Sequence, residues 1–192
     1  AESSFAWLEL RGRSDDRDTV LDLDYRPTMW SSVHEARAAA QRAIAQSSVV
    51  VGNRTECEMA VGLDEPDAIV DDLLERGVRL AIVKLGGGGV LVADSSDRMR
   101  IDPLDIDVLC GLGAGDAFGG ALVHGLLSGW DLERIGRFAN GAGAYVATQL
   151  TCADAMPTTT MVDEVVEHGG TRELQERRRW NINSTGRITP HL

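Results

Sequence analysis

Short apolar runs alternate with helix-like segments along most of this 192-residue chain. Four runs are typical of strands. In TVLDLDYRP (19–27) apolar and acidic residues alternate until a proline, and SVVVGN (48–53), VRLAIVKL (78–85) and VLVA (90–93) are short apolar runs. Strands that alternate with helices predict an α/β layered domain with a mainly parallel sheet. Ligands of such sheets bind at the carboxyl ends of the strands, so the residues that follow each strand are the candidates for function.

Helix-start and helix-stop signals place the helices of this domain. Ser32 and Glu35 form a capping pattern at the start of the first helix, and Gly77 ends the third. The segment 99–109 predicts short edge-like strands before a second glycine turn. The expected helices are 31–46, one opening at 53–61, 67–76, 116–128, 132–149, and a last one that begins near 158–160.

Composition narrows the classes of partner. The formal net charge is −11, which argues against nucleic acid or an anionic membrane as the main partner. Cys57, Cys110 and Cys152 are far apart and form no zinc-ligand spacing, so reduced thiols in a cytoplasmic protein are the simple interpretation. No apolar run reaches the length of a membrane span. We therefore expect a cytoplasmic protein with small-molecule ligands.

The stretch GLGAGDAFGG (111–120) is a glycine turn that opens a helix. It lacks the lysine of a Walker loop, and Asp116 stands where a dinucleotide fingerprint needs its third glycine. The N–H groups of Gly113, Ala114 and Gly115 are expected to point unpaired from the helix start, which makes an anion site. Asp116 then has two open interpretations: a helix N-cap, or a base that accepts a proton from a substrate hydroxyl.

Two further motifs follow predicted strands. In VKLGGGGVLV the four glycines 86–89 leave backbone bare enough to lie against a flat ligand, although a plain flexible hairpin is the alternative. In GNRTE, Glu56 could hold a hydrated Mg²⁺, an ion that needs few carboxylates. The alternative there is a capping box between Asn53 and Glu56, which the two residues alone would favour.

Taken in order, these motifs resemble the ribokinase (PfkB-type) carbohydrate kinases. GAGDAF matches the most specific signature of that family, GNRTE its N-x-x-E motif, and VKLGGGGV its nucleotide-side glycine turn. FANGAGAYVA (138–147) is similar to the helix that flanks the adenine. Within the family, DLDYRPTMW (22–30), the segment 124–140 and TCADAMPT (151–158) most resemble the 5-dehydro-2-deoxygluconokinase subfamily, which acts in inositol breakdown.

The resemblance implies a ribokinase-like α/β/α fold and a role for each motif. Asp116 would be the base that takes the proton from the terminal hydroxyl of a sugar or sugar acid, with ATP as phosphoryl donor. Glu56 would hold Mg²⁺. The implied anion hole is Gly113, Ala114 and Gly115; the implied nucleotide contacts are Asn53, Lys84, Leu85, Gly86, Gly87, Gly88, Gly89, Gly115 and Asn140; and the implied substrate contacts, held more loosely, are Asp24 and Arg26.

The chain also departs from the family pattern. Many relatives read Asp-Thr-Thr before GAGD, where this chain reads Cys110-Gly111-Leu112, so binding of a monovalent cation is in doubt. The resemblance implies an N-terminal half with the first strands and most sugar contacts, and we expect this chain to correspond to the part after it. We expect residues 1–18 to end a preceding helix or linker, 19–168 to be the nucleotide-binding part, and 169–192 to be a basic, mobile tail.

A second hypothesis follows from the expectation that this chain lacks that N-terminal half. The chain would be a truncated, inactive remnant that binds nucleotide or only a partner chain. It would then expose an apolar sheet edge and tend to associate, for example as a homo-oligomer. A dinucleotide-binding domain is a weaker third interpretation.

Overall fold

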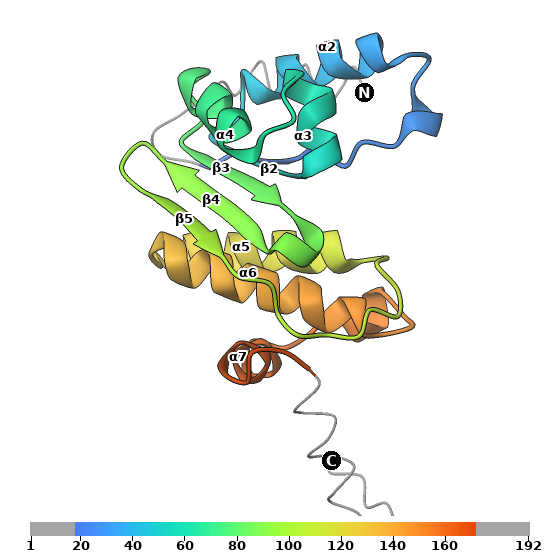
Figure 1. Ribbon diagram of the computed structural model, residues 1–192, viewed down its shortest axis with the longest axis vertical. Coiled ribbons are helices and arrows are strands. Elements are labelled where there is room, and N and C mark those ends of the chain that lie inside the picture. The colour runs from blue at the N-terminus through green and yellow to red at the C-terminus, as the bar shows by residue number, and fades with distance from the viewer. Residues whose placement is uncertain (1–17, 172–192) are drawn as a thin grey trace, which may run out of the picture. The chain divides into compact units, whose positions relative to one another are not determined.

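The computed structural model describes residues 18–171 (Figure 1). The described residues form two compact units. One contains those up to Pro103 together with Trp130–Gly136, and the other contains Leu104–Gly129 and those from Arg137 onward. The helix end expected within 1–18 and the basic tail expected from residue 169 lie almost wholly outside the described residues.

The first unit is built on a five-stranded sheet whose spatial order follows the chain. Its strands are β1 (Val20–Asp22), β2 (Val49–Asn53), β3 (Leu80–Lys84), β4 (Val90–Asp94) and β5 (Arg98–Ile101). β1, β2 and β3 pair in parallel, whereas β4 and β5 join as antiparallel strands. The sheet is therefore mixed: its parallel part needs helical crossovers, and its antiparallel part needs only tight turns.

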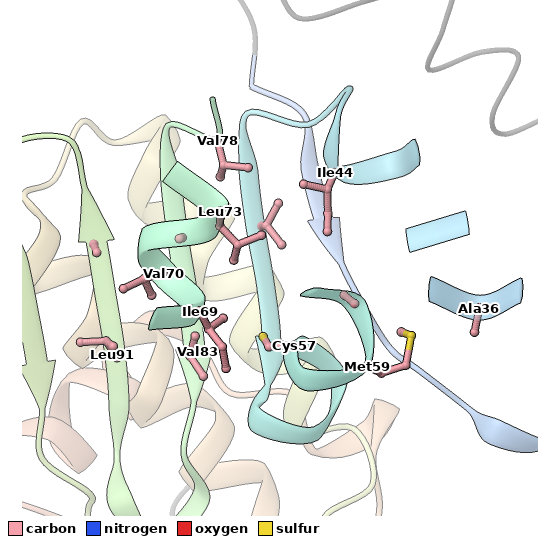
Figure 2. Close-up of a cluster of buried hydrophobic side chains, with 14 residues drawn as sticks. Ala36, Ile44, Cys57, Met59, Ile69, Val70, Leu73, Val78, Val83 and Leu91 are labelled. Atoms are coloured by element: carbon pink, nitrogen blue, oxygen red, sulfur yellow. The ribbon is translucent and has the colours of Figure 1, made fainter. Parts of the chain in front are cut away.

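Three helices of the first unit cover one face of this sheet (Figure 1). They are α2 (Val33–Ile44), α3 (Arg54–Val61) and α4 (Pro66–Glu75). Figure 2 shows the core between them, where Ile44, Ile69 and Leu73 are completely buried against strand residues. In β2, β3 and β4, consecutive residues, whose side chains point to opposite faces of the sheet, are buried. This is expected for an α/β sheet with both faces covered.

The second unit contains most of the remaining helices. α5 (Ala114–Leu127) and α7 (Thr159–Glu167) lie wholly within it, and α6 (Leu132–Ala147) continues into it from the first unit. Gly141 of α6 lets α7 approach closely, because a Cβ there would lie 2.6 Å from Val166 Cγ2. Short 3-10 turns complete the described elements: η1 (Pro27–Met29), η2 (Gly86–Gly88) and η3 (Ala153–Ala155).

The predicted α/β class is confirmed, and each predicted helix is present with ends that differ by a few residues. Ser32 caps α2 as expected, accepting a hydrogen bond from the Glu35 N–H at 3.1 Å. The predicted strand 19–27 is shorter, because Asp24 turns the chain with a positive φ of 32°. Within the described residues, every helix is too short or too polar to span a membrane.

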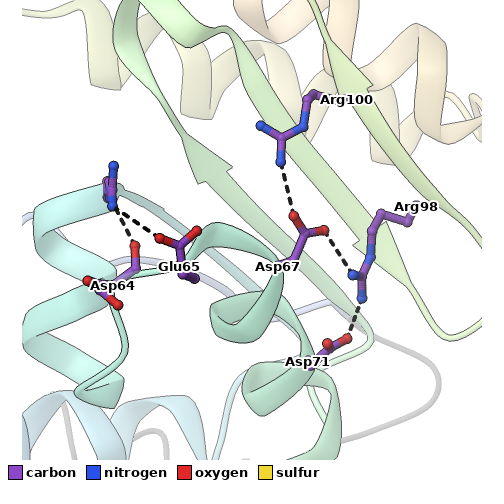
Figure 3. Close-up of polar contacts among 7 residues, drawn as sticks. Asp64, Glu65, Asp67, Asp71, Arg98 and Arg100 are labelled. Atoms are coloured by element: carbon purple, nitrogen blue, oxygen red, sulfur yellow. Dashed lines mark hydrogen bonds and ion pairs between the residues drawn. The ribbon is translucent and has the colours of Figure 1, made fainter.

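Exposed ion pairs tie β5 to α4 on the surface of the first unit (Figure 3). Arg98 contacts Asp67 and Asp71, and Arg100 contacts Asp67 at 3.0 Å. Hydrogen bonding to Asp71 is the main cause that raises the pKa of Arg98; partial desolvation opposes it, and the hydrogen bond to Asp67 adds to it. Such exposed pairs contribute little stability each, but they give the outer strand a charged surface that discourages pairing with other chains.

Candidate functional site

The carboxyl ends of the three parallel strands bring polar side chains together. Asp22 ends β1, Asn53 ends β2 and Lys84 ends β3, and Asn53 lies directly beside Lys84 in the sheet register. The Lys84 Nζ lies 3.8 Å from Asp22 Oδ1, which makes an ion pair across the end of β2. The Lys84 side chain is only 19% exposed, so its charge acts in a partly desolvated place.

Asn53 and Glu56 form the capping box that was one of the two interpretations of GNRTE. Asn53 Oδ1 accepts from the Glu56 N–H at 2.9 Å, and Glu56 Oε2 accepts from the Asn53 N–H at 2.6 Å. Burial raises the pKa of Glu56, against the opposing effects of the Asn53 hydrogen bond and of Lys84. The two roles are compatible, since the second carboxylate oxygen is not part of the box.

Asp24 and Arg26 lie just past β1. The Arg26 guanidinium contacts Asp24 Oδ1 at 2.7 Å, and both side chains are more than half exposed. The positive φ of Asp24 is uncommon for a residue other than glycine. Its N–H donates to Asp22 Oδ1 at 3.3 Å, a bond that helps to hold this turn.

The four-glycine turn after β3 is internally hydrogen-bonded. Leu85 N–H donates to the Gly89 carbonyl at 2.8 Å, and the N–H groups of Gly88 and Gly89 donate to Leu85 and Gly86. Gly89 is required by geometry: its φ is +82°, and a Cβ there would lie 1.9 Å from the Ile101 carbonyl oxygen. Gly87 has no such reason, because a Cβ there would meet nothing within 4 Å. A hairpin alone does not explain that glycine.

The second unit holds the GAGD turn at the start of α5. Gly113 is the N-cap with a left-handed φ of +84°, and a Cβ there would lie 2.6 Å from Cys152 Cβ. The Ala114 N–H donates to the Gly111 carbonyl over a long 3.3 Å. Among the described residues, the N–H groups of Gly113, Gly115 and Asp116 have no partner, so the helix start presents the free donors that an anion needs.

Asp116 is not the N-cap, so that interpretation was wrong. The helix starts two residues earlier than predicted, because Gly113 supplies the turn through its backbone and leaves Asp116 at the third helical position. Its side chain is exposed and makes no hydrogen bond or ion pair with residues 18–171. The Asp116 carboxylate, exposed beside unpaired backbone N–H groups and without a structural task among these residues, is available for chemistry.

Asn140 lies in the part of α6 that belongs to the second unit and is half-buried. One turn further along, Gly143 allows α6 to approach the start of α5, because a Cβ there would lie 3.1 Å from the Ala114 carbonyl oxygen. Asn140 is therefore held on a helix that packs against the GAGD turn. The other predicted residues of this unit lie in that turn itself.

The charged residues of the first unit fit Mg²⁺ bound mainly through water and phosphate. Across residues 18–171, no three His, Cys, Asp or Glu side chains are grouped as a ready-made metal site. Mg²⁺ does not need one, since it keeps several waters and takes one or two carboxylates plus phosphate oxygens. Glu56 suits that arrangement, because its buried carboxylate carries a desolvation cost that a nearby cation would relieve.

Comparison with known proteins places these motifs in a family. Residues 4–159 match the family described as pfkB family carbohydrate kinase. The chain belongs to the pfkB carbohydrate kinase family. Two relatives named 5-dehydro-2-deoxygluconokinase, from Clostridium tetani and Bacillus licheniformis, are 27% and 30% identical over 88% and 77% of this chain. The match covers 52% and 46% of those relatives, so the chain spans about half their length.

Solved structures support the ribokinase-like fold of this pfkB family chain. A putative ribokinase II from E. coli superposes with a TM-score of 0.75 at 20% identity, covering 87% of this chain and 52% of the other. A fructokinase from Vibrio cholerae O395, in a form with fructose, ADP and calcium ion bound, gives a TM-score of 0.72 at 24% identity over 84% of this chain and 53% of the other. The predicted fold family is thereby confirmed.

One polar residue among the pfkB family motifs escaped the sequence analysis. Asp22 contacts both Lys84 and the Asp24 N–H, yet the alternation in DLDYRP drew attention only to the residues after the strand. A signal was present: Asp22 and Asp24 are two residues apart and so share a face of an extended chain. Finding the partner Lys84 required the register of three strands, which no local pattern contains.

Proposed function

We propose that the chain carries out ATP-dependent phosphorylation of the terminal hydroxyl of a sugar acid, with 5-dehydro-2-deoxygluconate as the first substrate to test. The pfkB family membership supports a carbohydrate kinase. The names of the two relatives support the sugar acid as substrate, and segments 22–30, 124–140 and 151–158 agree with it.

One observation carries the proposal: among residues 18–171 Asp116 has no structural partner, although it stands beside backbone donors that are free within the same range. An acid in the first turn of a helix is normally explained by capping, and Asp116 caps nothing. The N–H groups beside it suit the charge that spreads over a phosphoryl group during transfer. The pairing of a base and an anion hole is what phosphoryl transfer to an alcohol needs.

In the proposed reaction, each of these residues has a defined role in moving the proton and the phosphoryl group. The Asp116 carboxylate accepts the proton of the sugar hydroxyl while the hydroxyl oxygen forms a bond to the γ-phosphorus of ATP. The bond between that phosphorus and the β–γ bridging oxygen breaks, and ADP leaves with the electron pair. The donors of Gly113, Gly115 and the Asp116 N–H stabilise the equatorial oxygens. Ala114 joins them only if its long bond to Gly111 opens.

The nucleotide is assigned to the remaining motifs. Lys84 and the turn from Leu85 to Gly89 are proposed to line ATP, with Gly87 leaving open space. Asn140 is proposed to lie near the adenine of ATP. Asn53 and Glu56 are proposed to organise the phosphates. A bound Mg²⁺ would neutralise phosphate charge there, held by Glu56 directly or through water. Asp24 and Arg26 are proposed sugar contacts.

The test is an ADP-release assay on the 192-residue chain with 5-dehydro-2-deoxygluconate and MgATP. Asp116→Asn keeps the shape and removes the base, so we expect the turnover number to fall by about 10²–10⁴. Asp163→Asn is the matched control, because Asp163 is an exposed carboxylate on α7 in the same unit. Equal turnover in the chain and in Asp116→Asn would contradict the proposal.

A second candidate is favoured by the extent of the match. The chain spans about half the length of its relatives. The second candidate is that this span binds nucleotide or a partner chain without turning over sugar. Calorimetry with MgATP separates the two candidates. Nucleotide binding without ADP release, for any sugar acid tested, supports the second candidate.

A further inference from the structure

The Asp22 carboxylate contacts two functional elements through the same oxygen. Oδ1 lies 3.8 Å from the Lys84 Nζ and accepts a hydrogen bond from the Asp24 N–H at 3.3 Å. Lys84 ends β3 and Asp24 begins the turn after β1, so this one group links two strands across the end of β2. Neither the family motifs nor the sequence analysis gave Asp22 a role.

The charges around Asp22 are unbalanced toward the negative. Asp22, Asp24 and Glu56 carry three carboxylates, and Lys84 and Arg26 carry two cations. Arg26 is held by Asp24 at 2.7 Å. Burial is the main cause that raises the pKa of Glu56; among the nearby charges, Lys84 lowers this pKa, and Asp22 and Asp24 raise it. An anion that approaches Lys84 is therefore also repelled by these carboxylates, and the charge of Lys84 alone does not outweigh that repulsion.

We infer that Asp22 is a positioning residue, which holds Lys84 at the strand ends and whose charge makes phosphate binding there depend on a divalent cation. The inference rests on the proposed function, because it concerns the nucleotide assigned to Lys84. Free ATP is repelled by the Asp22 carboxylate and competes with it for the Lys84 ammonium. When ATP arrives with Mg²⁺, the carboxylates face a cation, so the same field becomes favourable.

The experiment measures the affinity of the 192-residue chain for ATP by calorimetry, once with excess Mg²⁺ and once with excess EDTA. Asp22→Asn keeps an oxygen that can accept from the Asp24 N–H and removes the charge. Asp18→Asn is the matched control: Asp18 precedes the same strand at its other end, where it pairs with Arg79. Both variants change the net charge equally.

We expect Asp22→Asn to narrow the affinity ratio between MgATP and free ATP by about tenfold, as loss of one nearby charge at a partly screened site predicts. Asp18→Asn is expected to leave the ratio unchanged. An equal loss of affinity for both forms in Asp22→Asn would mean a purely structural role and would overturn the inference, as would an unchanged ratio. Absence of binding in the unsubstituted chain, with or without Mg²⁺, would overturn the proposed function and this inference together.

Discussion

Helices α3 and α5 both carry an acidic residue at the third position, but the two acids have opposite circumstances. Glu56 of α3 folds back onto Asn53 and closes a capping box, and the residue is only 6% exposed. Asp116 of α5 follows a glycine N-cap that offers no side chain, and it stays exposed without a partner in residues 18–171. The residue before the helix thus decides whether an acid at this position stabilises the fold or remains available for chemistry.

The largest expected effect comes from adding a side chain at the glycine N-cap of α5. Gly113→Ala puts a Cβ 2.6 Å from that of Cys152 at a φ of +84°, so we expect the free energy of unfolding to fall by about 3 kcal/mol. Gly62→Ala is the control at the other end of α3: its φ is +82°, but the nearest atom is the Arg37 Cζ at 3.7 Å. There the expected loss is about 1 kcal/mol. Urea denaturation gives both values, and similar losses would contradict the steric argument.

A smaller effect is expected from opening the closed helix start. Asn53→Ala removes the acceptor of the Glu56 N–H, and we expect a loss of about 1–2 kcal/mol in the free energy of unfolding. Ser32→Ala removes the corresponding acceptor at α2, for an expected loss of about 1 kcal/mol. Asn53→Ala is expected to cost more stability than Ser32→Ala, because Glu56 is buried and its N–H loses its acceptor there. A smaller cost for Asn53→Ala, measured by the same denaturation, would show that the box is not important for stability.

How much of this contrast could be predicted depends on the residues involved. Asn53 and Glu56 are three residues apart at a strand-to-helix junction, so the capping box was visible in the sequence as one of two interpretations. The start of α5 was placed two residues late, since a carboxylate followed by a helical run suggested a cap. The close approach of Cys152, which leaves no room for a side chain at Gly113, comes from 39 positions away in the sequence, where no local pattern can predict it. The contact between Asp22 and Lys84 was missed for the same reason.

The smallest expected effect is a change in pH dependence. The native state raises the pKa of Glu56 above its ordinary 4.5, mainly through burial, so the native state holds that proton more tightly than the unfolded chain does. The stability contribution of Glu56 is therefore fully present below pH 4.5 and declines as pH rises through the raised pKa. Glu56→Gln keeps an acceptor for the Asn53 N–H, so its stability relative to the unsubstituted chain should increase from pH 4 to pH 7.

Thermal unfolding across that pH range measures the difference. Asp116→Asn is the comparison variant. Because it removes an exposed carboxylate that has no partner in the described part of the chain, we expect it to change stability by less than about 0.5 kcal/mol. If the stability of Glu56→Gln relative to the unsubstituted chain stays constant or falls as pH rises, the prediction is wrong. The native state would then stabilise the Glu56 carboxylate enough to offset the cost of its burial.

The turn 86–89 has a practical consequence. Gly89 is fixed by the nearby Ile101 carbonyl, whereas Gly87 is exposed and surrounded by empty space. A cysteine introduced at position 87 would therefore carry a fluorescent label with little cost to folding. Burial raises the pKa of Cys57 to about 12, so that thiol would stay unlabelled, and only Cys110 and Cys152 would need replacement. The turn then becomes a reporter whose emission responds to whatever molecule lies against it.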